Sequence, residues 1–341
     1  MDVADSLNTE KLEVSTPFIR DADIAELAKW PKVIAALTEA YGKPIKDVMV
    51  PPRIMARGEG FWLRSLCAVS PSGEYMGCKL IAASPKIRRA SYLISLFDQR
   101  TMELAALVDG NRITDLRTAA TAVVAANAVI PEGALRVGVI GSGSVAKSML
   151  TALLSVREVS LARVFSPTPA SRARFAASFL ESNGLLLEAV DSAQAAIDGV
   201  DVVVCAARSR DESPVLLGDW LQPGMVVLSV GSTLPEQREV DSSAMARADL
   251  IIADMPEEVL HETGDALVAT RDGVDVAGKT VSLADVVSGQ KPARRSPDDI
   301  VIYKSVGTAL QDVVTAEMLL REALSSNRYQ LIPAGVVTID R

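Results

Sequence analysis

A glycine-rich turn between a strand and a helix constrains the fold of this chain more than any other feature. Residues 136–140 form an apolar run, the turn reads Gly141-Ser142-Gly143-Ser144-Val145-Ala146, and residues 147–156 have helical character. In a dinucleotide-binding unit the first glycine permits the tight turn, the second lets the backbone approach a pyrophosphate, and a small third residue allows close helix packing. The pattern predicts a dinucleotide site on residues 141–145. The alternative is a turn with a purely structural role.

The composition indicates a globular protein of about two domains. The chain has 341 residues, of which 49% are hydrophobic and 23% charged, an ordinary balance for a chain that buries sizeable cores. The net charge of −8 and the 4% of aromatic residues argue against a nucleic-acid or anionic-membrane partner. Residues 1–5 lack the start of a signal peptide, and no run approaches the ~18 apolar residues of a membrane span. We therefore expect a cytoplasmic protein.

Cysteine and histidine are too sparse for a metal centre. Cys67, Cys78 and Cys205 show no C-x-x-C spacing and lie in apolar, strand-like surroundings, so we expect buried free thiols. His261 is the only histidine, which excludes a site built on two histidines. It is either a proton donor facing a crevice or a partly exposed polar residue at a helix end. We expect no metal.

The order of the predicted elements indicates an α/β protein with two domains. Residues 20–41 carry apolar side chains at helical spacing, and three β-like runs follow, at 61–69, 75–83 and 91–97. From residue 119 onward, strand-like runs alternate with helical stretches, which is typical of a doubly wound parallel sheet. These runs are 137–140, 162–165, 200–206, 225–230 and 250–253.

We expect a Rossmann-type dinucleotide-binding domain over residues 119–314 and a separate α+β domain over residues 1–118. The helical stretch 307–324 and the segment 330–339 lie beyond the last α/β unit. The C-terminal residues 315–341 are therefore expected to return to the first domain and complete it.

The end of the strand after the glycine turn bears on the choice of coenzyme. A fold that selects NAD usually places an acidic residue there, on the ribose hydroxyls. Here the strand ends Phe165-Ser166-Pro167-Thr168 and has no carboxylate to repel a 2′-phosphate. Ser166 and Thr168 can donate hydrogen bonds to such a phosphate, and Arg172 can pair with it. NADPH is favoured over NADH. The alternative is that Arg172 is solvated and the site accepts both.

A small-residue helix before the glycine turn carries the first candidate substrate ligand. Its sequence is Ile113-Thr114-Asp115-Leu116-Arg117-Thr118-Ala119-Ala120-Thr121-Ala122, in which Thr114 and Asp115 read as a helix-capping signal. Arg117 then falls in the first turn, where a guanidinium beside free helix N–H groups forms a strong carboxylate site. The alternative is a surface arginine or an ion-pair partner.

Together, several segments resemble the ornithine cyclodeaminase/mu-crystallin family, and the resemblance covers most of the chain. It implies an N-terminal dimerisation domain completed by the C-terminus, a Rossmann domain and a homodimer acting on amino or imino acids. The matching segments are Pro51-Pro52-Arg53 with Met55, Met76-Gly77-Cys78-Lys79-Leu80, Phe97-Asp98, Thr114 to Ala120, Gly141 to Ala146, Ser229-Val230-Gly231-Ser232, Glu262-Thr263-Gly264-Asp265, and Tyr303-Lys304-Ser305-Val306-Gly307 with Asp312.

The same resemblance implies roles for individual residues. Arg53, Lys79 and Arg117 are expected to hold the substrate carboxylate between the two domains, with Lys79 and Arg117 acting in catalysis. Charge-assisted bonds would orient the substrate while hydride moves between its α-carbon and the nicotinamide. Lys79 can also donate a proton near the imine nitrogen if burial lowers its pKa. Further cofactor contacts are expected from Thr118, Ser305, Val306 and Gly307.

One departure from the family pattern bears on the reaction. Thr233 stands where cyclodeaminases and alanine dehydrogenases of the family resemble one another in having an aspartate, and a threonine hydroxyl cannot act as a base near neutral pH. We expect Thr233 to bind the substrate. Together with Lys304, which resembles the mu-crystallin branch, this favours an NAD(P)H-dependent enzyme that reduces the C=N bond of an imino acid or ketimine carboxylate. The alternatives are an ornithine cyclodeaminase or alanine-type dehydrogenase, and a non-catalytic protein that binds NADP and a small ligand.

Overall fold

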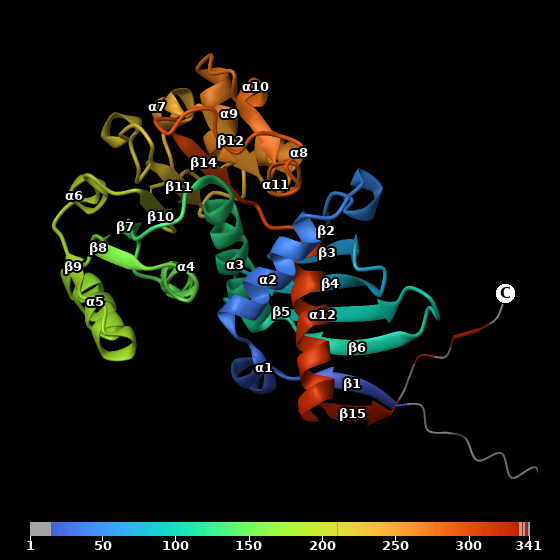
Figure 1. The fold of residues 1–341 in the computed structure, drawn as a ribbon. Helices are drawn as coiled ribbons and strands as arrows, with labels where there is room; N and C mark the ends of the chain where they lie inside the picture. Colours follow the sequence, from blue (N-terminus) through green and yellow to red (C-terminus); the bar gives the residue numbers. More distant parts are fainter. Residues whose placement is uncertain (1–14, 210, 334–335, 337, 340–341) are drawn as a thin grey trace, which may run out of the picture.

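The chain folds around two β-sheets joined by one long helix. The computed structural model describes residues 15–209, 211–333, 336 and 338–339. One sheet is mostly antiparallel, the other is entirely parallel, and helix α3 (Asn111–Val129) runs between them (Figure 1). The predicted α/β class with a doubly wound parallel sheet is confirmed. No helix in the described residues is both long and apolar enough to cross a bilayer.

The first sheet has seven strands in the order β15-β1-β6-β5-β4-β3-β2. The predicted runs at 61–69, 75–83 and 91–97 correspond to β3, β4 and β5. The chain returns to this sheet at its C-terminal end, where β15 pairs antiparallel with β1. The strand bounds are β1 (Ser15–Ile19), β2 (Ile54–Gly58), β3 (Phe61–Val69), β4 (Tyr75–Ser84), β5 (Arg89–Asp98), β6 (Leu104–Asp109) and β15 (Gln330–Pro333).

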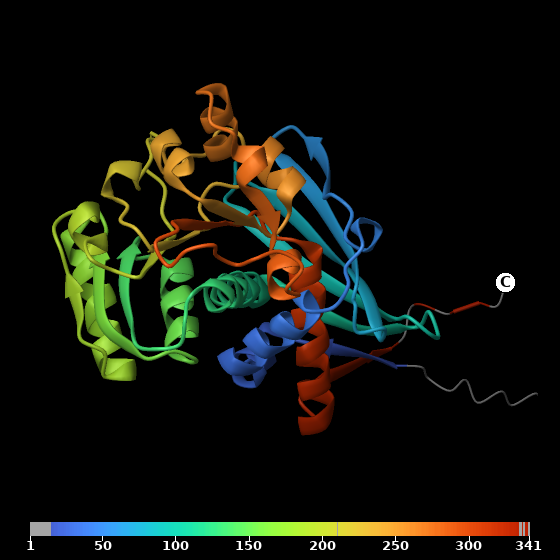
Figure 2. The ribbon, with the colours of Figure 1, turned by 45° about the horizontal axis from the view of Figure 1, so that its top comes forward.

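Helices cover one face of the first sheet. Figure 2 shows α2 (Trp30–Tyr41), α3 and α12 (Ala309–Ser326) on the same side of it. The helical spacing over residues 20–41 corresponds to two helices, α1 (Asp21–Leu27) and α2. The break falls before Pro31, whose ring would clash with the carbonyl four residues earlier in a continuous helix. The opposite face carries no described α-helix, and only the 3₁₀ turn η1 (Asp47–Met49) lies near it.

The second sheet has eight parallel strands in the order β13-β12-β14-β11-β10-β7-β8-β9. Strand order reverses at β7, because β8 follows on one side and β10 on the other, which creates the crevice where such folds bind nucleotides. The five predicted strand runs are present, whereas β9, β13 and β14 were not predicted. The strands are β7 (Leu135–Ile140), β8 (Val159–Phe165), β9 (Leu187–Ala189), β10 (Val202–Cys205), β11 (Val226–Ser229), β12 (Leu250–Ala253), β13 (Thr280–Ser282) and β14 (Val301–Lys304).

Short helices connect these parallel strands. They are α4 (Ser144–Leu154), α5 (Pro169–Asn183), α6 (Ala193–Ile197), α7 (Ser242–Arg247), α8 (Pro256–Glu262), α9 (Gly264–Arg271), α10 (Val276–Lys279) and α11 (Leu283–Val287), with the 3₁₀ turn η2 (Gly218–Trp220). Of the cysteines expected to be buried, Cys205 is buried and Cys78 half-buried. Cys67 is exposed, because its side chain points to the face of the first sheet that the helices leave uncovered.

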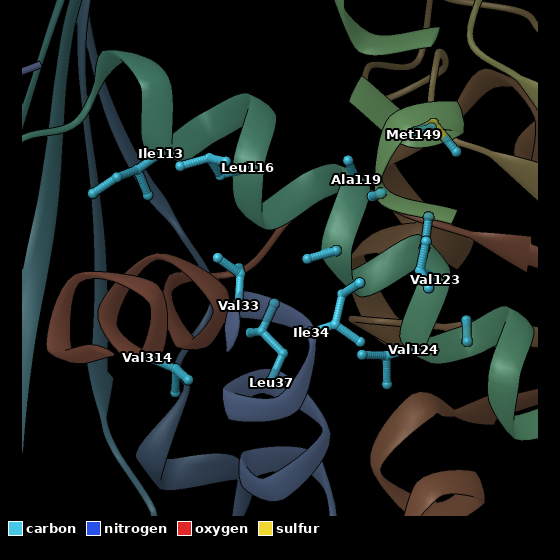
Figure 3. Packing of buried hydrophobic residues seen from close by; sticks show 14 of the residues in the cluster. Val33, Ile34, Leu37, Ile113, Leu116, Ala119, Val123, Val124, Met149 and Val314 are labelled. Atoms are coloured by element: carbon cyan, nitrogen blue, oxygen red, sulfur yellow. The ribbon is translucent and has the colours of Figure 1, made fainter. Parts of the chain in front are cut away.

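Helix α3 holds the two halves of the molecule together. It packs against α2 and α12 of the first half and against α4 of the second. Figure 3 shows its apolar side chains between those of α2, such as Val33, and Met149 of α4. Five of the six alanines of α3 are buried, which lets the neighbouring helices approach closely. The orientation of the two sheets therefore depends on a packed core rather than on a linker.

Candidate active site

The candidate site lies at the carboxyl ends of the parallel strands, where several loops meet. A methyl group added at Gly141, after β7, would lie 2.6 Å from the Ala206 carbonyl oxygen after β10. A methyl group at Gly231, after β11, would lie 3.1 Å from the Ala207 carbonyl oxygen. The glycine turn is thus in contact with the neighbouring loops, in the crevice expected to bind a ligand in this type of sheet.

The glycine turn has the geometry that a pyrophosphate needs. Gly141 has φ +116°, a conformation that favours glycine. Space above Gly143 is open, with no atom within 4 Å of an added methyl group. Helix α4 begins at Ser144, and its first turn leaves N–H groups without intrahelical acceptors. The turn therefore fits a dinucleotide pyrophosphate, as an anion at a helix N-terminus is favoured.

The side chains beyond β8 form a small polar cluster. The Ser142 hydroxyl donates to the Ser166 hydroxyl at 3.0 Å. Arg172 lies over the Phe165 ring, donates to the Ser166 carbonyl at 3.2 Å and pairs with exposed Asp191. Thr168, also predicted to bind the coenzyme, is exposed at the start of α5. Arg172 is thus partly buried and paired rather than solvated.

Lys79 and Arg117 share one buried carboxylate. Lys79 Nζ donates to Asp312 Oδ1 at 2.8 Å and to Thr114 Oγ1 at 2.7 Å, and its side chain is 1% exposed. Arg117 Nε donates to the same Asp312 oxygen at 3.2 Å, and Nη1 donates to Gln311 Oε1 at 2.8 Å. Burial lowers the pKa of Lys79, and the Asp312 charge opposes that change. The two cations therefore face the same small volume.

The predicted helix start before Arg117 was wrong. Helix α3 begins at Asn111 with Gly110 as its N-cap, so Arg117 lies in the second turn and not beside free N–H groups. The Thr114 hydroxyl does not cap the helix. It donates to the Gly110 carbonyl at 3.3 Å and accepts from Lys79. Arg117 is held by side chains of α12 instead.

Arg53 joins the first half of the chain to the loops of the second. Its guanidinium contacts Glu258 at 3.2 Å and Glu262 at 2.5 Å, both on α8, and its side chain is 6% exposed. It also donates to the carbonyl oxygens of Thr233 at 3.2 Å and Val306 at 3.4 Å. Arg53 thus fixes two loops that leave neighbouring parallel strands.

The segment 305–307 lies between Arg53 and Arg117. A methyl group at Gly307, which has φ +80°, would lie 2.4 Å from Arg117 Nη1. Asp254, after β12, accepts from the Ser305 hydroxyl at 2.6 Å and from the N–H groups of Val306 and Gly307 at 3.0 and 2.9 Å. Those N–H groups are therefore occupied. Arg53, Lys79 and Arg117 are linked through this segment and Asp312.

A buried polar network supports the loop that carries Thr233. The Thr233 N–H donates to Gln237 Oε1 at 2.9 Å, and its hydroxyl donates to the same oxygen at 3.2 Å. Beneath the loop, Lys304 is fully buried and pairs with Asp265 at 2.8 Å. Glu262 and Asp265, which belong to one of the matching segments, are thus both ion-pair residues. His261 on α8 is exposed, and its Nε2 lies 3.4 Å from Glu257.

Sequence reasoning missed three residues near the site. Asp254 is one. Asp115 is another: burial raises the pKa of its carboxyl, and the adjacent Ser144 hydroxyl at the start of α4 opposes that rise. Arg64 on β3 is the third. Asp115 stood inside a quoted motif and was treated only as a cap, whereas nothing local in the sequence marks Asp254 or Arg64. Thr118 lies on α3, partly buried.

The comparisons with known proteins agree with this geometry. The family model described as the ornithine cyclodeaminase/mu-crystallin family matches residues 17–327. The ketimine reductase mu-crystallin of Rattus norvegicus is 31% identical over 300 residues, which cover 85% of this chain and 90% of that protein. A Delta(1)-pyrroline-2-carboxylate reductase of Bacillus cereus is 29% identical over 263 residues, 75% of this chain and 80% of that protein.

A solved structure has the same fold over almost its whole length. Delta(1)-pyrroline-2-carboxylate reductase of Thermococcus litoralis, solved in complex with NADH and L-proline, superposes with a TM-score of 0.83 and is 26% identical. The match covers 92% of this chain and 99% of that chain. The two-sheet architecture is therefore shared with a protein whose structure was solved with a coenzyme bound.

Proposed function

This chain belongs to the ornithine cyclodeaminase/mu-crystallin family, and from that premise we propose that it is an NAD(P)H-dependent reductase. The reaction is reduction of the C=N bond of an imino acid or ketimine carboxylate to an amino or cyclic imino acid. The observation that carries the proposal is the convergence of Arg53, Lys79 and Arg117 at the carboxyl ends of the parallel strands. The named activities of the rat and Bacillus cereus relatives support the same reaction class.

The side chains divide the work as follows. Arg117 donates from Nε to Asp312 and from Nη1 to Gln311. Its Nη2 donates to no group in the described residues, so Nη2 can bind the substrate carboxylate. Lys79 has three donors and uses two. Because burial lowers its pKa, Lys79 can hold a proton near the imine nitrogen and release it as the nitrogen gains electron density. The coenzyme, when bound, supplies the hydride.

Thr233 favours reduction over cyclodeamination. Its hydroxyl is held by Gln237, and its carbonyl accepts from Arg53, so this position provides no ionisable base. We propose that Thr233 shapes the substrate side of the loop through its backbone. An enzyme of this kind consumes one NAD(P)H per product and releases no ammonia from ornithine.

Replacement of the two catalytic cations tests the site. We expect Lys79→Ala and Arg117→Ala each to lower kcat/KM for an imino acid by at least about tenfold, roughly 1.4 kcal/mol. Arg112→Ala is the matched control, because Arg112 lies on the same helix but is exposed and pairs with Asp21. Kinetics of Lys79→Ala and Arg117→Ala that match wild type would remove the carboxylate-site assignment. Failure of the wild-type protein to oxidise NAD(P)H with any imine would remove the function.

We further propose that NADPH is preferred over NADH. A 2′-phosphate beyond β8 would replace Asp191 as the partner of Arg172, whose guanidinium is already held at the Ser166 carbonyl. Arg172→Ala is expected to weaken NADPH binding at least about tenfold and NADH binding much less. Arg174→Ala on the same helix is the control, since Arg174 is exposed and bonds only Ser171. Equal losses for both coenzymes would contradict the preference.

The first domain, formed by residues 1–118 and 315–341, is proposed to form a homodimer. The face of its sheet that the helices leave uncovered presents Leu63, Leu80 and Leu93, exposed by 48%, 38% and 37%. Such an apolar patch is typical of an interface. We expect light scattering to show a dimer for the wild-type protein and a monomer for Leu80→Asp. Leu324→Asp is the control and should stay dimeric, because Leu324 is an exposed leucine of α12 rather than of this face. A monomeric wild-type protein would refute this.

We propose that the enzyme acts in the cytoplasm, where nicotinamide coenzymes and amino acids are abundant.

A further inference from the structure

A fourth cation, Arg64, lies on the substrate-facing side of the first sheet. In the antiparallel ladder Arg64 on β3 is opposite Ile81 on β4. Lys79 is two residues from Ile81 on the same strand, so Arg64 and Lys79 project to the same face. As diagonal neighbours across a strand pair they are about 7–8 Å apart at the backbone. On its other side Arg64 is opposite Met55, two residues after Arg53.

Arg64 differs from the other three cations because it pairs with no acid in the part of the chain that the structure describes. Arg53 pairs with Glu258 and Glu262, and Lys79 and Arg117 share Asp312. Among the described residues no acid lies within ion-pair distance of Arg64, and its side chain donates no hydrogen bond. Its Nε is buried and unpaired. The guanidinium carbon of Arg64 lies over the Trp62 ring, 5.1 Å from its centroid.

An unpaired, partly buried guanidinium is costly unless something binds it. Leaving a buried donor unsatisfied costs about 1–3 kcal/mol, and more for a charged group. Stacking on an aromatic ring keeps the planar fork rigid and oriented. That fork matches a carboxylate, which accepts two parallel N–H bonds. The structure therefore offers a preformed carboxylate ligand one strand away from Lys79.

Resting on the function proposed above, we infer that Arg64 binds a second carboxylate, on the substrate side chain. The preferred substrate class is then an imino dicarboxylate rather than an imino monocarboxylate. Arg117 and Lys79 bind the α-carboxylate beside Gly307. Arg64 lies on the neighbouring strand of the first sheet, where it binds the carboxylate at the other end of the substrate. A substrate with a short carbon chain between its two carboxylates spans the distance between Lys79 and Arg64 when each carboxylate makes hydrogen bonds of about 2.9 Å.

A matched pair of substrates tests this inference. The imines formed by methylamine with 2-oxoglutarate and with 2-oxopentanoate have the same chain length and differ in the terminal carboxylate. We expect the wild-type enzyme to show a kcat/KM at least about tenfold higher for the dicarboxylate. Arg64→Met, which keeps the length of the side chain, should reduce that ratio at least about tenfold. Arg64→Lys, which keeps the charge without the fork, should give an intermediate ratio.

The role of Arg64 can fail in this experiment while the reductase function holds, and the two failures give different results. Arg112→Met removes the same charge from an exposed site on α3 and should keep the wild-type ratio. Equal use of the two imines by the wild-type enzyme would overturn the role of Arg64 and leave the reductase proposal intact. An equal loss with both imines in Arg64→Met would also overturn it, because Arg64 would then act on the shared α-carboxylate. No reduction of either imine would instead count against the proposed function.

Discussion

Replacing Gly143 with alanine separates coenzyme binding from protein stability. Gly143 has φ −85° and ψ −178°, which any residue adopts, and an added methyl group meets no atom within 4 Å. Reduced freedom of the unfolded chain favours Gly143→Ala by about 0.4–1 kcal/mol. Loss of a glycine at the N-cap of α4 opposes this by a similar amount, about 0.5–1 kcal/mol. We therefore expect the free energy of unfolding without coenzyme to change by less than about 1 kcal/mol.

Coenzyme binding should respond very differently, because the methyl group occupies the space through which a pyrophosphate approaches the backbone. We expect the dissociation constant to rise at least about tenfold. At a coenzyme concentration 100 times the wild-type dissociation constant, binding stabilises the wild-type protein by about 2.7 kcal/mol. For a tenfold weaker complex the same concentration gives only about 1.4 kcal/mol. Urea unfolding with and without NADPH measures both quantities.

The matched control is Gly141→Ala in the same turn. Gly141 has φ +116°, and its added methyl group would lie 2.6 Å from the Ala206 carbonyl oxygen. Strain of this kind costs about 1–3 kcal/mol, so Gly141→Ala should be destabilised without any coenzyme. The reasoning is refuted if Gly143→Ala is destabilised by more than about 2 kcal/mol without coenzyme, or if it gains as much stability from NADPH as wild type does.

Three further variants test the cation site and its surroundings. Gly307→Ala places a methyl group 2.4 Å from Arg117 Nη1 and should raise KM for the imino acid about tenfold in steady-state kinetics; an unchanged KM would show that the guanidinium does not bind substrate there. Asp312→Asn leaves Lys79 and Arg117 without their carboxylate, and urea unfolding should show a loss of about 3–5 kcal/mol; a loss below about 1 kcal/mol would contradict the shared pairing. Burial raises the pKa of the Asp115 carboxyl in the folded protein, so the contribution of Asp115 to the stability of the wild-type protein falls as the pH rises from the unfolded pKa through that raised pKa. Asp115→Asn removes this titration, and its stability relative to wild type should increase over that window; a difference that stays flat with pH would contradict it.

The sequence predicted the elements whose patterns are local. Strands β3, β4 and β10 were recognised from short apolar or alternating runs, and the glycine turn from its spacing. Strand β14 was missed because its apolar run ends in Lys304, a charged residue that is usually exposed to solvent. In the folded chain Lys304 is fully buried, since Asp265 and Ser229 come from elsewhere to satisfy it. A buried charge can be recognised only once its partners are known.

The candidate site was predicted unevenly for the same reason. Arg53, Lys79 and Arg117 were named as substrate ligands, and Asp312 and Glu262 were quoted in the matching segments, but the pairing of these acids with the cations was not predicted. Asp312 is 233 positions from Lys79 along the chain, and no local pattern connects them. The helix start before Arg117 was misplaced because Thr114 has the chemistry of a cap. Its hydroxyl accepts a hydrogen bond from Lys79 instead, a contact that depends on how β4 packs on α3. The boundaries of the two domains stay a prediction.

The position of Asp312 explains how the two halves of the chain make one site. Strand β14 lies inside the parallel sheet, the turn at Gly307 follows it, and α12 then crosses to cover the first sheet. Asp312 lies in the first turns of α12, where it meets Lys79 from the first sheet and Arg117 from α3. A shift of one sheet relative to the other would therefore move Gly307 away from Arg117 and the Thr233 carbonyl away from Arg53, whereas Asp312 would stay with the first sheet, on which α12 packs. The geometry of the cation site depends on the packing of α3 and α12 between the sheets, so core substitutions in these helices should alter KM even where they contact no ligand.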